Sequence, residues 1–154
     1  MIAYLSGGME NAQNEGADWR SDMTNWLKEN LGHDTIDPVI ETKKTVLAHG
    51  AEEYQDWKMT DYGKYKEFIR LLINQDLRAV IGKVDYLIVL WDESILYGGG
   101  THGEVTMAYW VDRPIFLVNK LPKEKLSGWI SSCSTETFDS FDELKKALLA
   151  EFQL

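Results

Sequence analysis

The stretch Val84-Asp85-Tyr86-Leu87-Ile88-Val89-Leu90-Trp91 contains the longest apolar run of this chain, from Tyr86 to Trp91. Its β-branched and aromatic side chains predict the strongest strand of the protein. The apolar run has about a third of the length that a membrane-spanning helix needs. We therefore interpret it as a strand of the core and expect no membrane partner.

Apolar periodicity extends the pattern in both directions from this strand. Further strands are predicted at residues 2–5, 35–39, 114–118 and 129–133. Helices are predicted at residues 17–31, 63–82, 101–111 and 140–152. Pro38 argues against a helix around it, and Ser140 and Glu143 have the spacing of a capping box that opens the last helix. Residues 41–62 have no clear period, which is typical of a lid, a binding loop or an element that periodicity does not reveal.

Strands that alternate with helices predict an α/β fold. We expect a three-layer sandwich in which helices cover both faces of a doubly wound parallel sheet of about five strands. No linker or internal repeat divides the chain, so a single domain is expected over residues 1–154. Ligands of such folds bind at the carboxyl ends of the strands, and this rule directs attention to the loops after Leu5 and Trp91.

Composition limits the functions that this chain can have. It contains 25 acidic and 16 basic residues, for a formal net charge of −9. A negatively charged protein repels phosphate polymers, so we expect no nucleic-acid partner. Cys133 is the only cysteine, and a single thiol fits a reducing compartment. The first residues have no basic region followed by an apolar stretch, so the expected location is the cytoplasm.

Asp76 lies within the apolar face of the predicted helix at residues 63–82, four residues after Leu72 and four before Val80. An ionised carboxylate on a buried face is unfavourable unless it has a partner. Either Asp76 pairs with Arg78 or a backbone amide, or the apolar face opens onto a cavity there. An aspartate at the edge of the apolar face that reaches water is an equally good interpretation.

The segment Gly98-Gly99-Gly100-Thr101-His102-Gly103-Glu104 follows the loop after the strongest strand. Its glycines permit positive φ and let a ligand approach the backbone. Thr101 suits a helix N-cap, which would place Glu104 in the first turn, where the helix dipole favours the ionised form. An ionised and accessible carboxylate is the group that attacks an anomeric carbon. A capping box between Thr101 and Glu104 is the competing, purely structural interpretation.

Asp92 lies at the carboxyl end of the strongest strand, where a parallel sheet presents functional side chains. A turn-opening role explains it equally well. Residues 98–103 match the pattern G-x-G-x-x-G, but they follow a late strand and lack the acidic residue of a dinucleotide site. The chain's histidines are too scattered to predict a metal site: His33, His49 and His102.

Taken in order, five segments resemble the nucleoside 2-deoxyribosyltransferase family and the related deoxynucleoside 5′-monophosphate N-glycosidases. These segments are Tyr4-Leu5-Ser6-Gly7-Gly8, Asn74-Gln75-Asp76-Leu77, Val84 to Asp92, Gly100 to Tyr109 with Glu104 within it, and Pro114 to Val118. The similarity covers most of residues 1–120.

The resemblance implies a flavodoxin-like fold and an enzyme that needs no metal or organic cofactor and assembles as a homo-oligomer. It implies that Glu104 attacks C1′ of the sugar and that Asp76 contacts the base and helps to protonate the leaving nitrogen. Asp92 would bind sugar hydroxyls, and Tyr4 would orient Glu104, although core packing also explains this tyrosine. The residues expected to bind substrate are Ser6, Gly7, Gly8, Gly100 and Thr101.

These roles require different surroundings for two carboxyl groups. Burial should raise the pKa of Asp76 so that it can donate a proton, whereas Glu104 at a helix N-terminus should stay ionised without a raised pKa. The expected partners are a nucleoside or nucleotide and a free base. Transfer of the sugar to a second base, hydrolysis by water, and a non-catalytic nucleotide-binding module on the same fold all remain open. Ser6 and Arg20 are candidates for binding a 5′-phosphate, and Arg20 can equally pair with a surface carboxylate.

Overall fold

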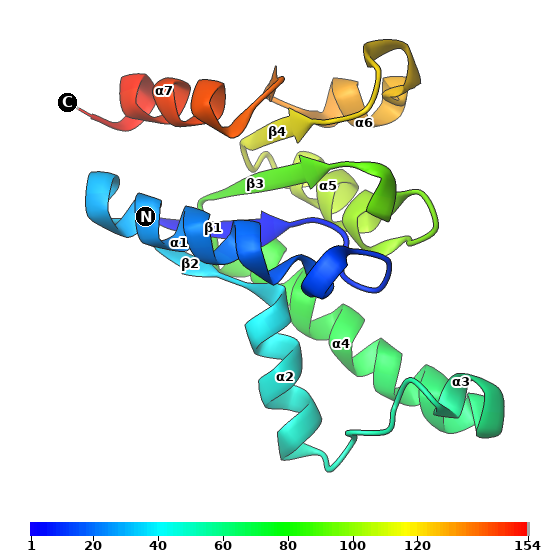
Figure 1. Ribbon diagram of the computed structural model, residues 1–154. Helices are drawn as coiled ribbons and strands as arrows, with labels where there is room; N and C mark the ends of the chain where they lie inside the picture. Colours follow the sequence, from blue (N-terminus) through cyan, green and yellow to red (C-terminus); the bar gives the residue numbers. More distant parts are fainter. Residues whose placement is uncertain (154) are drawn as a thin grey trace.

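A computed structural model describes residues 1–153 and has one five-stranded sheet in the order β2-β1-β3-β4-β5. All neighbouring strands are parallel, as the alternation of strands and helices predicts. The strands are β1 (Ile2–Ser6), β2 (Asp34–Ile36), β3 (Tyr86–Trp91), β4 (Ile115–Asn119) and β5 (Glu136–Phe138). Figure 1 shows the sheet with β1 and β3 side by side at its centre. The result is a flavodoxin-like α/β fold.

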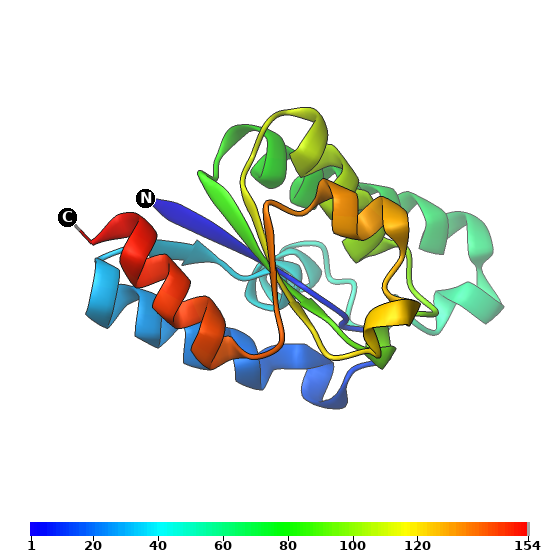
Figure 2. The ribbon, with the colours of Figure 1, turned by 90° about the horizontal axis from the view of Figure 1, so that it is seen from above.

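Helices cover both faces of the sheet. They are α1 (Ala17–Leu31), α2 (Pro38–Ala48), α3 (Trp57–Thr60), α4 (Tyr62–Gly82), α5 (Gly100–Trp110), α6 (Gly128–Cys133) and α7 (Phe141–Phe152). Three short 3₁₀ helices join them: η1 (Gln13–Gly16), η2 (Glu93–Ile95) and η3 (Lys123–Lys125). Helices α1 and α7 lie on one face and α4, α5 and α6 on the other, as the view from above shows (Figure 2).

Two apolar cores result from the two-residue period of the strands. In β1, Ala3 and Leu5 pack toward α1 and α7, while Tyr4 packs toward α4 and α5. In β3, Ile88 packs toward α1 and α7, and Leu87 packs toward α4 and α5. The central strands are therefore buried on both sides, which explains their continuous apolar sequence.

The prediction of a strand at residues 129–133 is wrong. This segment forms α6, whose first turn is capped by Ser127 through a hydrogen bond from the backbone N–H of Ile130. The last strand is β5, three residues further on, where only Phe138 is buried. Short apolar runs do not distinguish a strand from one helical turn, and the serine cap decided the outcome.

The expectation that Pro38 excludes a helix is also wrong. Pro38 begins α2, because a proline at the first helical position loses no hydrogen bond and has a suitable φ. Asp37 caps the helix by accepting a hydrogen bond from the backbone N–H of Val39, at 2.9 Å. The strand predicted at residues 35–39 is therefore the shorter β2, followed at once by a helix.

Residues 41–62 consist of most of α2, a turn, and α3. Together with α4 they form a third apolar cluster, in which Ala51, Tyr54 and Trp57 pack with Phe68 and Leu72 of α4. Figure 1 shows α3 and the start of α4 extending away from the sheet. Among residues 1–153, no helix combines the length and apolar character needed to cross a membrane.

Candidate active site

Glu104 is a buried carboxyl group on α5, with 7% of its surface exposed. It is the fifth residue of the helix, which begins at Gly100 after an N-cap at Gly99. The prediction that Thr101 caps the helix and that Glu104 occupies its first turn is therefore wrong. The capping box between these two residues does not form either, because the helix is capped at Gly99, two residues before the N-cap expected at Thr101.

Two hydroxyl groups from β1 hold the Glu104 carboxyl group. Tyr4 donates a hydrogen bond through Oη to Oε2 of Glu104. Ser6 donates one through Oγ to Oε1, at 2.9 Å. Tyr4 and Ser6 are two residues apart on one strand, so both side chains point to the face that α5 covers. This contact agrees with the orienting role expected for Tyr4, whereas Ser6 acts on Glu104 and does not line the cavity beside it.

Asp76 and Glu104 line the same cavity, which has a volume of about 230 Å³. The cavity lies at the carboxyl ends of β1 and β3, where a parallel sheet binds its ligands. Asp76 comes from the middle of α4 and is partly buried. Of the alternatives open for this residue, the structure selects an apolar helix face that opens onto a cavity.

Burial acts on both carboxyl groups of the cavity. It raises the pKa of Asp76 to about 7, with a further contribution from the nearby charge of Glu104. Burial also raises the pKa of Glu104, against the hydrogen bonds from Tyr4 and Ser6 and the positive charge of Arg20. The expectation for Asp76 agrees with the structure, and the expectation that the pKa of Glu104 is not raised is wrong. The helix N-terminus is one turn away, so desolvation dominates.

Glycines and small polar residues form the remaining wall of the cavity. Gly7 and Gly8 follow β1, and Gly100 and Thr101 begin α5, and all four line the cavity. The glycines of the 98–103 segment do not have positive φ, contrary to the reason first given for them. These glycines leave the backbone of the cavity wall uncovered by side chains. At Gly100, for example, an added Cβ would meet nothing within 4 Å.

Gly8 is required by close packing. A Cβ at this position would lie 2.0 Å from Oγ of Ser94 and 2.8 Å from its Cβ. Ser94 in turn is held by Asp92, which accepts hydrogen bonds from its backbone N–H, at 2.9 Å, and from its Oγ. Asp92 thus caps η2, and it does not line the cavity, although Ser94 does. The structure does not bring Asp92 together with Asp76 and Glu104.

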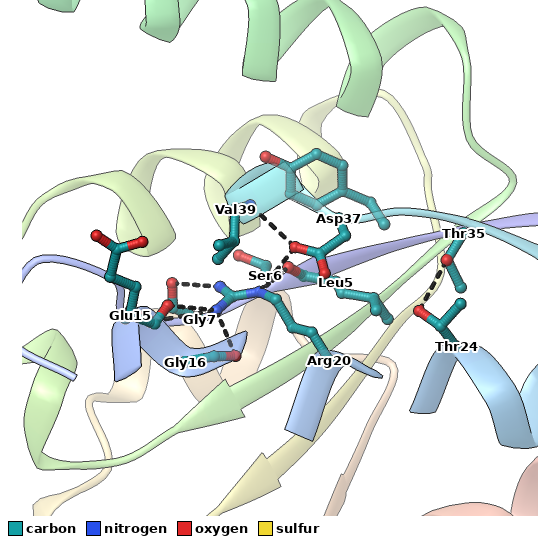
Figure 3. A network of polar contacts seen from close by, with 12 residues as sticks. Leu5, Ser6, Gly7, Glu15, Gly16, Arg20, Thr24, Thr35, Asp37 and Val39 are labelled. Atoms are coloured by element: carbon teal, nitrogen blue, oxygen red, sulfur yellow. Dashed lines mark hydrogen bonds and ion pairs between the residues drawn. The ribbon is translucent and has the colours of Figure 1, made fainter. Parts of the chain in front are cut away.

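Arg20 of α1 is fully buried and organises the loop after β1 (Figure 3). Its guanidinium group donates hydrogen bonds to the carbonyl oxygens of Leu5, Gly7 and Gly8 at 2.8–3.3 Å. It also donates to two carbonyl oxygens of η1, those of Glu15 and Gly16.

Arg20 also lies 3.9 Å from Asp37, a buried carboxylate at the start of α2. All three guanidinium nitrogens are thus committed to the protein, which argues against the phosphate-binding role considered for Arg20. Its partner carboxylate is buried, so pairing at the surface is wrong as well.

The role of Arg20 was missed from the sequence, although one signal was present. Arg20 lies three residues before Met23 and seven before Leu27, and both of these are buried on α1. The spacing places the arginine on the core face of the helix. A charged residue on that face requires partners, just as Asp76 did on α4.

The described residues, 1–153, contain no group of three or more His, Cys, Asp or Glu side chains placed to bind a metal ion. The site consists of two carboxyl groups, the hydroxyls that orient one of them, and a glycine-rich wall.

Comparison with known proteins supports the fold. No family model matches the sequence, and no match was found among curated proteins. Among solved structures, the chain is similar to a 2-deoxyribosyltransferase from the psychrotolerant bacterium Bacillus psychrosaccharolyticus, described as a biocatalyst for nucleoside synthesis. The match covers 99% of this chain and 96% of that one, with a TM-score of 0.67 and 16% sequence identity. At this identity, the similarity establishes the shared fold.

Proposed function

We propose that this protein cleaves the N-glycosidic bond of a nucleoside through a covalent glycosyl-Glu104 intermediate and transfers the sugar to another base. The observation that carries the proposal is the Glu104 carboxyl group, held by Tyr4 and Ser6 on the wall of a cavity that also contains Asp76. A carboxylate with fixed orientation is suited to attack a sugar carbon. The fold of a 2-deoxyribosyltransferase supports the choice of reaction.

The two carboxyl groups take complementary parts in the proposed reaction. An oxygen of Glu104 forms a bond to C1′ while the bond from C1′ to the base nitrogen breaks, and the bonding electron pair leaves with the base. Asp76 donates the proton that the base nitrogen needs, because a pKa of about 7 keeps a substantial fraction protonated near neutral pH. A second base then attacks C1′, Glu104 leaves as a carboxylate, and Asp76 recovers a proton from the incoming base.

Tyr4 and Ser6 have a further part in the proposal. Burial favours the neutral form of Glu104, which is a poor nucleophile. The two donated hydrogen bonds and the charge of Arg20 favour the carboxylate and leave it facing the cavity. Asp92 contributes by holding Ser94 in the cavity wall, in place of the direct contact with sugar hydroxyls that the resemblance implied.

The charges around the cavity favour a nucleoside over its 5′-monophosphate. The lining includes the carboxyl groups of Asp76, Glu104 and Glu10, the last paired with Lys58 at 3.8 Å, and, within residues 1–153, no lysine or arginine side chain. A phosphate dianion placed there would be repelled. The hydrolysis of nucleoside 5′-monophosphates is therefore the second candidate.

A homo-oligomer is also proposed. Helices α5 and α6 contact each other through a hydrogen bond from Nε1 of Trp129 to Oγ1 of Thr106, at 3.0 Å. On these helices Tyr109, Trp110 and Trp129 have 55%, 78% and 68% of their surfaces exposed. Aromatic side chains are enriched at protein interfaces. Light scattering on the purified protein tests this, and a monomer at all concentrations would exclude it.

The decisive experiment is a chromatographic screen of nucleosides and their 5′-monophosphates, each with and without an acceptor base. Exchange of the base that requires an acceptor identifies a transferase, and release without one identifies a hydrolase. Glu104→Ala should abolish both, and Asp76→Asn should lower kcat far more than it raises KM. Binding of nucleosides with no release of base from any compound would instead identify a non-catalytic binding module.

A further inference from the structure

The cavity that contains Asp76 and Glu104, called the inner cavity below, adjoins a second, outer cavity of about 330 Å³. Four residues line both cavities, namely Met9, Glu10, Tyr54 and Ile69. These residues come from the loop after β1, from the turn before α3, and from α4. The inner and outer cavities therefore adjoin at these four residues.

One face of helix α4 runs from the inner cavity to the outer cavity. Tyr65, Ile69, Ile73 and Asp76 follow one another at steps of four, four and three residues, so they share one helix face. Asp76 lines the inner cavity only, Ile69 lines both, and Tyr65 lines the outer cavity only. A ligand group that extends from Asp76 along this face enters the outer cavity.

The proposed reaction places the base of the substrate beside Asp76, on the side of the inner cavity that adjoins the outer one. Asp76 must reach the leaving nitrogen, and Asp76 lies on the helix that continues into the outer cavity. The wall formed by Ser94 and Gly98 to Gly100 belongs to the inner cavity alone and lies beside Glu104, which receives the sugar. In the binding mode that the proposed reaction requires, the outer cavity is thus nearer to the base than to the sugar.

Aromatic packing and an ion pair hold the walls of the outer cavity, which combine apolar and charged side chains. Tyr54 packs against Phe68 with ring centroids 4.9 Å apart, and Trp57 packs against the same ring from another side. An ion pair of 3.8 Å between Lys58 of α3 and Glu10 of the loop after β1 joins two sides of the rim. The wall therefore offers tyrosine rings to an apolar group and charged side chains to a polar end.

We infer that the outer cavity is a binding subsite for a substituent on the leaving base, so that the protein accepts nucleosides whose base carries an additional ring-sized group. This inference rests on the proposed function for the placement of the base. A base placed beside Asp76 lies in the inner cavity, which leaves the adjoining outer cavity for a group attached to that base. The tyrosines and Ile69 pack against the added ring.

Binding measurements test the subsite separately from catalysis. The Kd values of 2′-deoxyadenosine and of its derivative with a benzyl group on the exocyclic amine are measured on the Glu104→Gln protein by calorimetry. The derivative should bind about tenfold more tightly, because burial of an aromatic ring is favourable. Ala12→Trp and Gln55→Trp, at two residues that line only the outer cavity, should remove this preference. Glu29→Trp on the exposed surface of α1 adds the same bulk elsewhere and should keep it.

The outcomes separate the subsite from the reaction. A derivative that binds more weakly than 2′-deoxyadenosine, or a preference that survives both tryptophan substitutions, overturns the subsite even if the unaltered protein releases base. A preference that is lost in both variants supports the subsite even if no base is released, in which case only the proposed reaction fails. If neither nucleoside binds, the subsite is overturned, and the proposed reaction is overturned as well when the unaltered protein releases no base.

Discussion

The hydroxyl of Tyr4 donates a hydrogen bond to Oε2 of Glu104 across 100 residues of sequence. The contact joins the first strand of the sheet to the helix that follows the central strand. It fixes the orientation of a carboxyl group that has almost no contact with water. The bond therefore favours the ionised form of Glu104 in a place where burial opposes it.

Removal of this hydrogen bond should slow the proposed reaction more than it affects substrate binding. Tyr4→Phe keeps the ring in the core but leaves Oε2 of Glu104 without its donor. We expect kcat to fall on the order of tenfold to a hundredfold, which corresponds to the loss of one hydrogen bond to a charged group. Steady-state kinetics with a nucleoside and an acceptor base measure the change.

Tyr86→Phe provides a matched control. Tyr86 is a buried tyrosine of β3 whose hydroxyl group lies 2.9 Å from Nδ1 of His33, in the other core. This variant also loses a buried hydrogen bond of a tyrosine hydroxyl, but it leaves Glu104 untouched, so its kcat should not change. An equal loss of kcat in both variants would mean that the effect of Tyr4→Phe is one of general stability.

The raised pKa of Asp76 predicts the alkaline side of the pH profile. The proposed role requires the protonated carboxyl group, so kcat should fall as the pH rises through about 7. Rates measured from about pH 5 to about pH 9 should show this descending limb. A substrate whose base leaves without protonation should lack it, as should Asp76→Asn at its much lower rate. A descending limb that persists in Asp76→Asn would assign the titration to another group.

The network of Arg20 predicts a large effect on stability. Arg20→Met removes five hydrogen bonds to carbonyl oxygens and leaves the buried Asp37 without its cation. We expect the free energy of unfolding to fall by about 3–5 kcal/mol, measured by denaturant titration. Arg78→Met, on the exposed surface of α4, should change it by less than about 0.5 kcal/mol. A small effect of Arg20→Met would show that the loop after β1 holds its shape without the guanidinium group.

The close approach of Gly8 to Ser94 predicts that a side chain at position 8 lowers both stability and nucleoside binding. In Gly8→Ala the new methyl group would overlap Oγ of Ser94, so either the loop after β1 or η2 must move. We expect a loss of about 1–3 kcal/mol in stability and weaker nucleoside binding, since both residues line the inner cavity. Adding Ser94→Gly should restore part of both quantities. Gly128→Ala, where an added Cβ meets nothing within 4 Å, is the control and should have neither effect.

Where residues interact with near neighbours in the chain, the sequence predicted the structure well. The apolar run of β3 and the helical period of α4 depend on spacings of two to four residues, and both elements occur where expected. Asp76 was recognised for the same reason, because a carboxylate within an apolar helix face is a local anomaly. Residues 129–133 failed because an apolar turn of helix and a short strand have the same local pattern.

The amino-acid sequence by itself determined the parallel α/β sheet and the glycine-rich segment before Glu104. Tertiary structure alone decided that Ser6 binds Glu104 rather than a ligand, since these residues are 98 positions apart. It also decided that the charge of Arg20 is satisfied by backbone carbonyls and that burial raises the pKa of Glu104. Periodicity shows which side of an element is buried, whereas the partners of a buried polar group depend on which elements the fold brings together.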